Sequence, residues 1–277
     1  MTTITTPTES TEDHRPARRR RRGLRRAVYA VLTVTGLVAG ISGFALFQAF
    51  VAKPANGPDA FRGADAGPLT VVAGASTVQG TISADWVSGL HAPGTEVVNA
   101  GINGHTTRDL LDRLERDVIE LDPENVVLLV GTNDIRGDVA PATSKENVEE
   151  ILDRLTRETT ADVAMMSLQP LGEQLDSSRN ARVRAYNAMV AAAAAERGVD
   201  YLPLYESLVP IVEERTGPAP DFSFPIIRTA FDRFVFGRSF NDMSDSHGLR
   251  VTADNVHLNE RGAAVAQRLA GDWLAGR

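Results

Sequence analysis

The apolar residues fall into one long block near the N-terminus and a series of short runs after it. Residues 27–52 contain no charged side chain, and Lys53 follows them. As a helix with a rise of 1.5 Å per residue, this stretch would reach about 39 Å, which exceeds the roughly 30 Å hydrocarbon core of a membrane. We therefore expect residues 27–52 to form one transmembrane signal-anchor helix.

Arginine is concentrated just before this block, in a segment expected to be a disordered basic tail over residues 1–26. Positive charge marks the flank of a span that stays in the cytoplasm. We therefore expect a single-pass protein of the cell membrane with a cytoplasmic N-terminus and an extracytoplasmic globular part. Three other interpretations stay open: a cleaved secretory signal, a twin-arginine export signal at residues 21–24, and a nucleic-acid-binding patch.

The hydrophobic pattern after the span is that of alternating strands and helices. Glycine and proline mark residues 53–68 as a linker. Short apolar runs then predict strands at residues 69–73, 97–98, 126–130, 163–168 and 199–202. Helical spacing appears at residues 107–121, 144–157, 179–197 and 259–274. Because strands that are apolar on both faces are typical of covered parallel sheets, we expect a three-layer αβα sandwich with a five-stranded parallel sheet over residues 69–277.

Composition and charge narrow the classes of function. The 277 residues are 43% hydrophobic and 23% charged, as in a globular protein, and the absence of cysteine excludes a disulfide framework and a thiolate nucleophile. Of the 29 basic and 36 acidic side chains, residues 1–26 hold 8 and 3, which leaves residues 27–277 with 21 and 33, a net charge of −12. An acidic body repels phosphate, so we expect no nucleic-acid partner. No metal-ligand spacing or nucleotide-binding motif is evident, so we expect no metal and no cofactor.

The candidate chemistry follows the predicted strands, because ligands of open parallel sheets bind beyond the carboxyl ends of the strands. Ser76 lies at the first strand-to-helix turn, where its hydroxyl can face a site and its N–H can face an oxyanion. His257 follows Asp254 by three residues, a spacing that supplies a base and its orienting carboxylate. Gly104 and Asn133 offer a backbone N–H and a neutral amide as oxyanion donors.

Taken in order, four segments resemble the motif blocks of the SGNH, or GDSL, hydrolase family. They are similar to its Gly-Asp-Ser, N-x-x-x-x-G-x-T, G-x-N-D and D-x-x-H blocks and lie at residues 74–76, 99–106, 131–134 and 254–257. The chain departs from the family at Ala75, where an Asp is usual, which puts the local hydrogen bonding in doubt.

The resemblance implies a flavodoxin-like SGNH fold and a serine esterase or lipase that works through an acyl-serine intermediate. It implies that Ser76 is the nucleophile, that His257 is the base and that Asp254 orients this base. The oxyanion would bind to the N–H groups of Ser76 and Gly104 and to the amide of Asn133. The substrate would be a lipid ester, an acetylated glycan or a small acyl ester. Two alternatives stay open: an O-acyltransferase with the same triad, and a non-catalytic glycan- or lipid-binding module.

Six of the ten phenylalanines lie between residues 222 and 240, just upstream of the D-x-x-H block. We interpret this segment as a lid or acyl-pocket wall, with a face resting on the bilayer and a helix packing on the core as alternatives. The residues expected to line a pocket are His105, Phe222, Phe224, Phe231 and Phe234. His247 follows two aspartates in a segment, residues 241–248, that we expect to be a polar loop rather than a cation site. The oligomeric state is not predicted.

Overall fold

The computed structural model describes residues 15–63 and 67–276. The expected tail residues 1–14 and residues 64–66 of the expected linker lie outside the described residues. The chain divides into two compact units between Phe44 and Ala45, and each is described by itself.

Helix α1 (Arg15–Phe50) makes up the described part of the N-terminal unit and extends six residues into the second. Its segment Leu24–Phe50 has a mean hydropathy of 2.0 and is long and apolar enough to cross a membrane. Residues 15–26, which the sequence analysis assigned to a disordered tail, are helical in the structure. Arginine and alanine are good helix formers, so the helix of the apolar residues 27–50 continues back through residues 15–26.

The second unit is built on a five-stranded sheet in which every pair of neighbours is parallel. Its order is β2-β1-β3-β4-β5. The strands are β1 (Leu69–Gly74), β2 (Glu96–Gly101), β3 (Asn125–Leu129), β4 (Asp162–Met166) and β5 (Asp200–Leu202). All residues of β1 and β3 are buried, which explains why these strands are continuous apolar runs. The predicted α/β fold with a five-stranded parallel sheet is confirmed.

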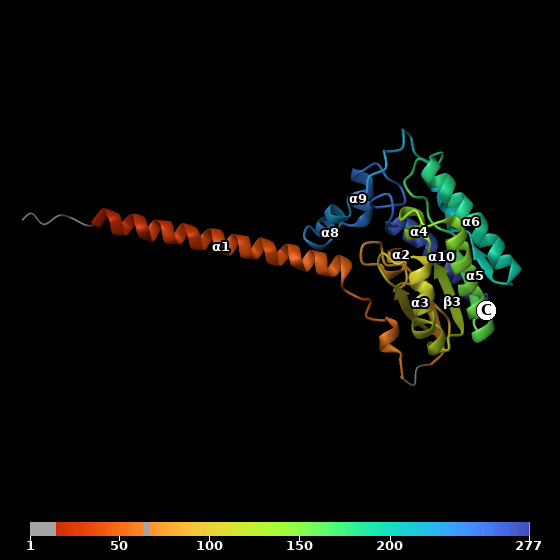
Figure 1. Ribbon diagram of the computed structural model, residues 1–277. Coiled ribbons are helices and arrows are strands. Elements are labelled where there is room, and N and C mark those ends of the chain that lie inside the picture. The colour runs from red at the N-terminus through yellow and green to blue at the C-terminus, as the bar shows by residue number, and fades with distance from the viewer. Residues whose placement is uncertain (1–14, 64–66, 277) are drawn as a thin grey trace, which may run out of the picture. The chain divides into compact units, whose positions relative to one another are not determined.

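Helices cover both faces of the sheet (Figure 1). Helix α5 contacts α3 on one side and α6 on the other, and α7 contacts α10. These helices are α3 (Thr107–Asp117), α5 (Pro141–Glu158), α6 (Ser178–Glu196), α7 (Leu204–Glu213) and α10 (Glu260–Ala275). The chain leaves β1 toward β2 and then returns past β1 to β3, so the strand order reverses at β1. Such a reversal places a binding crevice at the carboxyl end of β1.

Several short helices escape prediction because they are too short to show a helical period. They are α2 (Ser76–Gln79), α4 (Thr132–Arg136), α8 (Ile226–Phe234) and α9 (Phe240–Ser246), with 3₁₀ turns at Pro58–Ala60 and Ile119–Leu121. Helix α9 replaces most of the polar loop expected at residues 241–248. It forms because Ser239 and Asp242 make a capping box, in which each side chain bonds the backbone N–H of the other.

The expected linker lies along the free edge of the sheet. The N–H of Asn99 in β2 donates to the carbonyl oxygen of Asn56 at 2.9 Å, and the Asn56 side chain donates to Val97 at the same distance. These bonds satisfy backbone groups of an edge strand that would otherwise face solvent.

Candidate active site

Ser76 stands where β1 gives way to the four-residue helix α2. The turn is tight because Gly74 lies against β3: a Cβ at this position would be 2.1 Å from the carbonyl oxygen of Leu129. Ser76 is buried, with 6% of its surface exposed, and as the first residue of α2 its N–H has no partner within the helix. The hydroxyl and the N–H of one residue therefore reach the carboxyl edge of the sheet together.

Ser76, His257 and Asp254 form a continuous hydrogen-bonded chain. The Ser76 Oγ and the His257 Nε2 lie 2.9 Å apart, and the His257 Nδ1 lies 2.8 Å from the Asp254 Oδ2. Both His257 and Asp254 are almost fully buried. When Nδ1 carries the proton and donates a hydrogen bond to the carboxylate, the Nε2 lone pair faces the serine hydroxyl. The structure thus brings together the three residues predicted from the sequence, although Ser76 and His257 are 181 positions apart in the chain.

A tight turn at residues 254–257 gives this geometry its shape. The second carboxylate oxygen of Asp254 accepts the backbone N–H groups of Val256 at 3.1 Å and His257 at 2.8 Å. Asn255, between them, has a φ of 68°, a left-handed conformation that Asn tolerates better than most residues. Both oxygens of Asp254 are therefore occupied, and the D-x-x-H spacing follows from the turn itself.

Two buried polar side chains hold this turn in place. Glu173 accepts backbone N–H groups of Arg250, Val251 and Thr252 and pairs with the Arg215 guanidinium. The Gln169 amide donates to the carbonyl oxygen of Val256 at 2.8 Å and to the hydroxyl of Thr77 at 3.3 Å. The second set of bonds links the turn that carries His257 to the helix that begins with Ser76.

The two other oxyanion candidates follow the ends of β2 and β3. Gly104 follows β2 and has a φ of 79°, and a Cβ would meet nothing within 4 Å, so conformation rather than space favours glycine there. Asn133 lies on α4, after β3, and its amide donates one hydrogen bond to the carbonyl oxygen of His105 at 2.9 Å. An amide has two N–H groups, so one remains for another acceptor.

The segment after β3 fits closely against its surroundings. At Gly131, φ is 123° and a Cβ would come within 2.2 Å of the Tyr186 ring, so this position accepts only glycine. The carboxylate of Asp134 is buried and accepts from the N–H of Thr107 at 2.9 Å and from the hydroxyl of Ser144 at 3.1 Å. Asp134 therefore joins α4 to α3 and α5, and these bonds fix the position of Asn133 on α4.

Arg136 is a residue of this site that sequence reasoning missed. Its Nη1 donates to the side-chain oxygen of Asn133 at 3.3 Å, and its guanidinium carbon lies 4.0 Å from the centre of the Phe224 ring. Burial lowers the pKa of Arg136, and the Asp254 carboxylate opposes this shift. The spacing of three residues on α4 is the only local signal, and it is too common to have pointed here.

The residues expected to line a pocket separate into different places. Phe224 contacts the candidate base, with its ring centre 5.7 Å from that of His257. Phe222 packs beneath the Arg179 guanidinium at 3.6 Å, and Phe231 and Phe234 lie on α8. His105 is half-buried, and burial together with the nearby Arg113 lowers the pKa of its imidazole.

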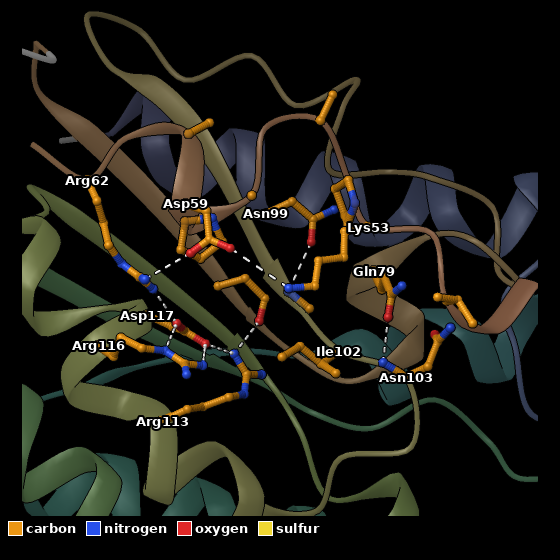
Figure 2. Close-up of a pocket in the computed structure, with 18 of the residues that line it drawn as sticks. Lys53, Asp59, Arg62, Gln79, Asn99, Ile102, Asn103, Arg113, Arg116 and Asp117 are labelled. Carbon is orange, nitrogen blue, oxygen red and sulfur yellow. Dashed lines mark hydrogen bonds and ion pairs between the residues drawn. The ribbon is translucent and has the colours of Figure 1, made fainter. Parts of the chain in front are cut away.

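A cavity of about 490 Å³ lies elsewhere, between residues 50–62, the end of β2 and α3 (Figure 2). None of the residues predicted to act on substrate or to line a pocket belongs to its wall. Asp117 in this wall accepts hydrogen bonds from Arg62, Arg113 and Arg116 (Figure 2). The charges here are paired with one another, so we assign the cavity a structural role in holding the expected linker against α3.

Within the described ranges, no group of three or more His, Cys, Asp or Glu side chains is placed to hold a metal ion. The acid–base groups at the carboxyl end of β1 are the serine, histidine and aspartate described above. Their arrangement can remove a proton from a hydroxyl and return it to a leaving group.

Comparisons with known proteins place this chain in a family. An acetylxylan esterase of Geobacillus stearothermophilus is 50% identical over 42 residues, which cover 15% of this chain and 19% of that protein. The crystal structure of the acetyl xylan esterase AlAXEase superposes with a TM-score of 0.59 at 18% identity, covering 75% of this chain and 98% of its own. Axe2, an acetylxylan esterase from Geobacillus stearothermophilus, superposes with a TM-score of 0.54 at 15% identity, covering 76% and 94%.

These two structures share the fold with this chain. The model of the GDSL-like lipase/acylhydrolase family matches residues 70–265, most of the second unit. The chain therefore belongs to this family and is an ester-hydrolysing serine hydrolase of the SGNH type.

Proposed function

We propose that this protein is a membrane-anchored extracytoplasmic esterase that hydrolyses a carboxylic ester through an acyl intermediate on Ser76. The observation that carries the proposal is the buried chain of short hydrogen bonds from Ser76 through His257 to Asp254. An alcohol is a weak nucleophile until a base takes its proton, and an imidazole held by a carboxylate is the common solution.

In the first half-reaction, Ser76 Oγ attacks the ester carbonyl carbon while its proton passes to Nε2 of His257. The carbonyl oxygen becomes an oxyanion, and collapse of the tetrahedral intermediate expels the alcohol, which takes the proton from Nε2. Water then repeats the sequence on the acyl-Ser76 ester and releases the carboxylic acid. Asp254 orients His257 and stabilises the imidazolium, because its side-chain oxygens accept hydrogen bonds from Nδ1–H and from two backbone N–H groups.

The oxyanion is held by three donors in this proposal: the N–H groups of Ser76 and Gly104 and the free amide hydrogen of Asn133. The other amide N–H of Asn133 donates a hydrogen bond to the carbonyl oxygen of His105. This bond fixes the orientation of the amide and therefore the direction of its remaining N–H. Fixed donors act on charge that develops only in the transition state. Ala75 is buried and leaves the bonds among Ser76, His257 and Asp254 intact.

Membrane anchoring and the outward orientation of the esterase are inferred from the N-terminal segment. The support is the apolar stretch Leu24–Phe50 together with the arginines that precede it. The acetylxylan esterases among the relatives make an acetyl ester the first substrate to test, with acylated glycans and lipids as further members of the same class.

The decisive experiment combines labelling with turnover. We expect the full chain to hydrolyse p-nitrophenyl acetate and to react with a fluorophosphonate at Ser76, and we expect Ser76→Ala to lose both. Ser83→Ala is the matched control, since Ser83 is also buried but donates to the carbonyl oxygen of Leu258 rather than to a base. Full activity of Ser76→Ala would contradict the proposal.

A further inference from the structure

Two exposed apolar side chains of the second unit lie on helix α8 or just beyond it. Outside residues 24–51, the described part of the chain exposes two large hydrophobic side chains, Ile227 and Phe236. They are 54% and 70% accessible, and they lie on α8 and just beyond its C-terminal end.

The same segment is basic although the protein body is acidic. Residues 226–238 carry Arg228, Arg233 and Arg238 against a single acidic residue, Asp232. Asp232 is shared by Arg228 at 3.6 Å and Arg238 at 3.1 Å, whereas Arg233 bonds only a backbone carbonyl oxygen and lies over a phenylalanine ring. An apolar face bordered by arginines is the composition of a helix that lies in a membrane interface.

Helix α8 also lies where the chain of α1 enters the globular unit. Ala49, Ile82 and Ala230 form a buried cluster, against which Ile226 and Phe234 of α8 pack. The carbonyl oxygen of Ala49 accepts hydrogen bonds from Thr81 at 3.0 Å and from Asn103 at 2.8 Å. The last turns of α1 are therefore held by the globular unit.

The remaining apolar part of α1 still suffices for a span. Residues 24–44 would reach about 31 Å at 1.5 Å per residue, close to the roughly 30 Å hydrocarbon core. A span of this length would end five positions before Ala49, the residue that packs against α8.

We propose that the exposed side of α8 at Ile227 and Arg228, together with Phe236 just beyond the helix, inserts into the lipid–water interface of the bilayer that α1 crosses. This inference rests on the proposed membrane anchoring. The apolar side chains enter the interface and Arg228 meets anionic headgroups. Because Phe224 precedes α8 and contacts His257, the segment covering the candidate base is held next to the membrane, which favours esters presented at its surface.

Depth-dependent quenching tests the proposal directly, and the absence of cysteine makes single-site labelling straightforward. The full chain carrying Phe236→Cys is labelled with bimane and reconstituted in vesicles of phosphatidylcholine and phosphatidylglycerol with nitroxide lipids. Glu196→Cys is the matched control, since this side chain is 69% accessible and lies at the C-terminal end of α6, a helix that contacts the edge strand β5. We expect shallow nitroxides to quench the label at 236 and to leave the label at 196 unaffected.

Equal quenching at both sites would overturn the proposal. So would a blue-shifted emission at 236 without lipid quenching, because it would mean that a protein surface, such as a second copy of the chain, covers α8. Carbonate-resistant association and hydrolysis of p-nitrophenyl acetate are measured on the same samples. Loss of either contradicts the proposed function, whereas intact anchoring and hydrolysis without quenching at 236 contradict the interfacial face alone.

Discussion

The guanidinium of Arg136 lies over the ring of Phe224 at 4.0 Å, and the same side chain donates to the amide oxygen of Asn133. One residue therefore links the segment that covers His257 to a candidate oxyanion donor. A hydrogen bond to the oxygen of an amide also polarises its N–H groups. We infer that Arg136 is a positioning residue that acts through Asn133.

Replacing Arg136 by alanine should lower kcat by about tenfold with little change in KM. Without Arg136 the Asn133 amide is less well oriented, and this orientation matters mainly for binding the oxyanion in the transition state. Steady-state kinetics on p-nitrophenyl acetate measures the split. Arg136→Lys should recover part of the loss, since it keeps a cation and a donor. Arg182→Ala is the matched control: Arg182 also bonds α4, at the carbonyl oxygen of Ile135, but does not touch Asn133. A rise in KM at constant kcat would assign Arg136 to substrate binding instead.

Asn133→Ala should reduce kcat by a factor on the order of 10²–10³, the usual cost of one lost oxyanion donor. The amide bonds only the carbonyl oxygen of His105 and the Arg136 side chain, so the fold should survive. The measurement is kcat together with the unfolding midpoint in urea. An unchanged kcat in a folded variant would remove Asn133 from the oxyanion hole.

Glu173→Ala should destabilise the protein by about 3 kcal/mol or more, because it leaves buried backbone N–H groups and the Arg215 guanidinium without their acceptor. Urea unfolding gives the difference in free energy. Activity should fall as well, since residues 250–252 lead into the turn that carries Asp254. Glu214→Ala serves as comparison, because Glu214 is exposed and pairs only with Arg250, and it should stay near wild type. Wild-type stability of Glu173→Ala would show that the turn is held by other contacts.

His105 should make folding weaker at acidic pH. Burial lowers the pKa of its imidazole, so the unfolded chain binds the proton more readily than the folded one. Its contribution is therefore complete above the unfolded pKa of about 6.5 and is lost as pH falls through the lower folded value. Thermal melts between roughly pH 7 and pH 5 should show a smaller decline in Tm for His105→Gln than for the wild type. Parallel declines in both proteins would contradict this linkage.

The fold was predictable because its strands are buried on both faces and appear as apolar runs. The same logic located Ser76, since Gly74 ends the first of these runs and a site was expected beyond it. Asp254 and His257 were found from their spacing, which the structure explains by a turn whose backbone N–H groups bind the aspartate. Their roles in catalysis remain proposals.

Long-range support was not predictable. Glu173 meets the N–H groups of residues 250–252 across 77 positions or more, and no local pattern marks such a pair. The role of Arg136 could not be predicted from the sequence either, because its partner Phe224 lies far along the chain. The phenylalanine-rich segment was visible in composition, but its side chains separate in the structure into one beside His257 and others on α8.

The bonds that tie Asn56 to Val97 and Asn99 decide where a shortened, detergent-free enzyme should start. A chain beginning at Leu69 would contain every strand but would leave the outer backbone N–H and C=O groups of β2 unpaired. Such an exposed edge strand can pair with strands of other molecules. A chain beginning at Lys53 would keep that edge occupied. The residues between α1 and β1 thus serve as an extra border of the sheet, and preparations that omit them should self-associate.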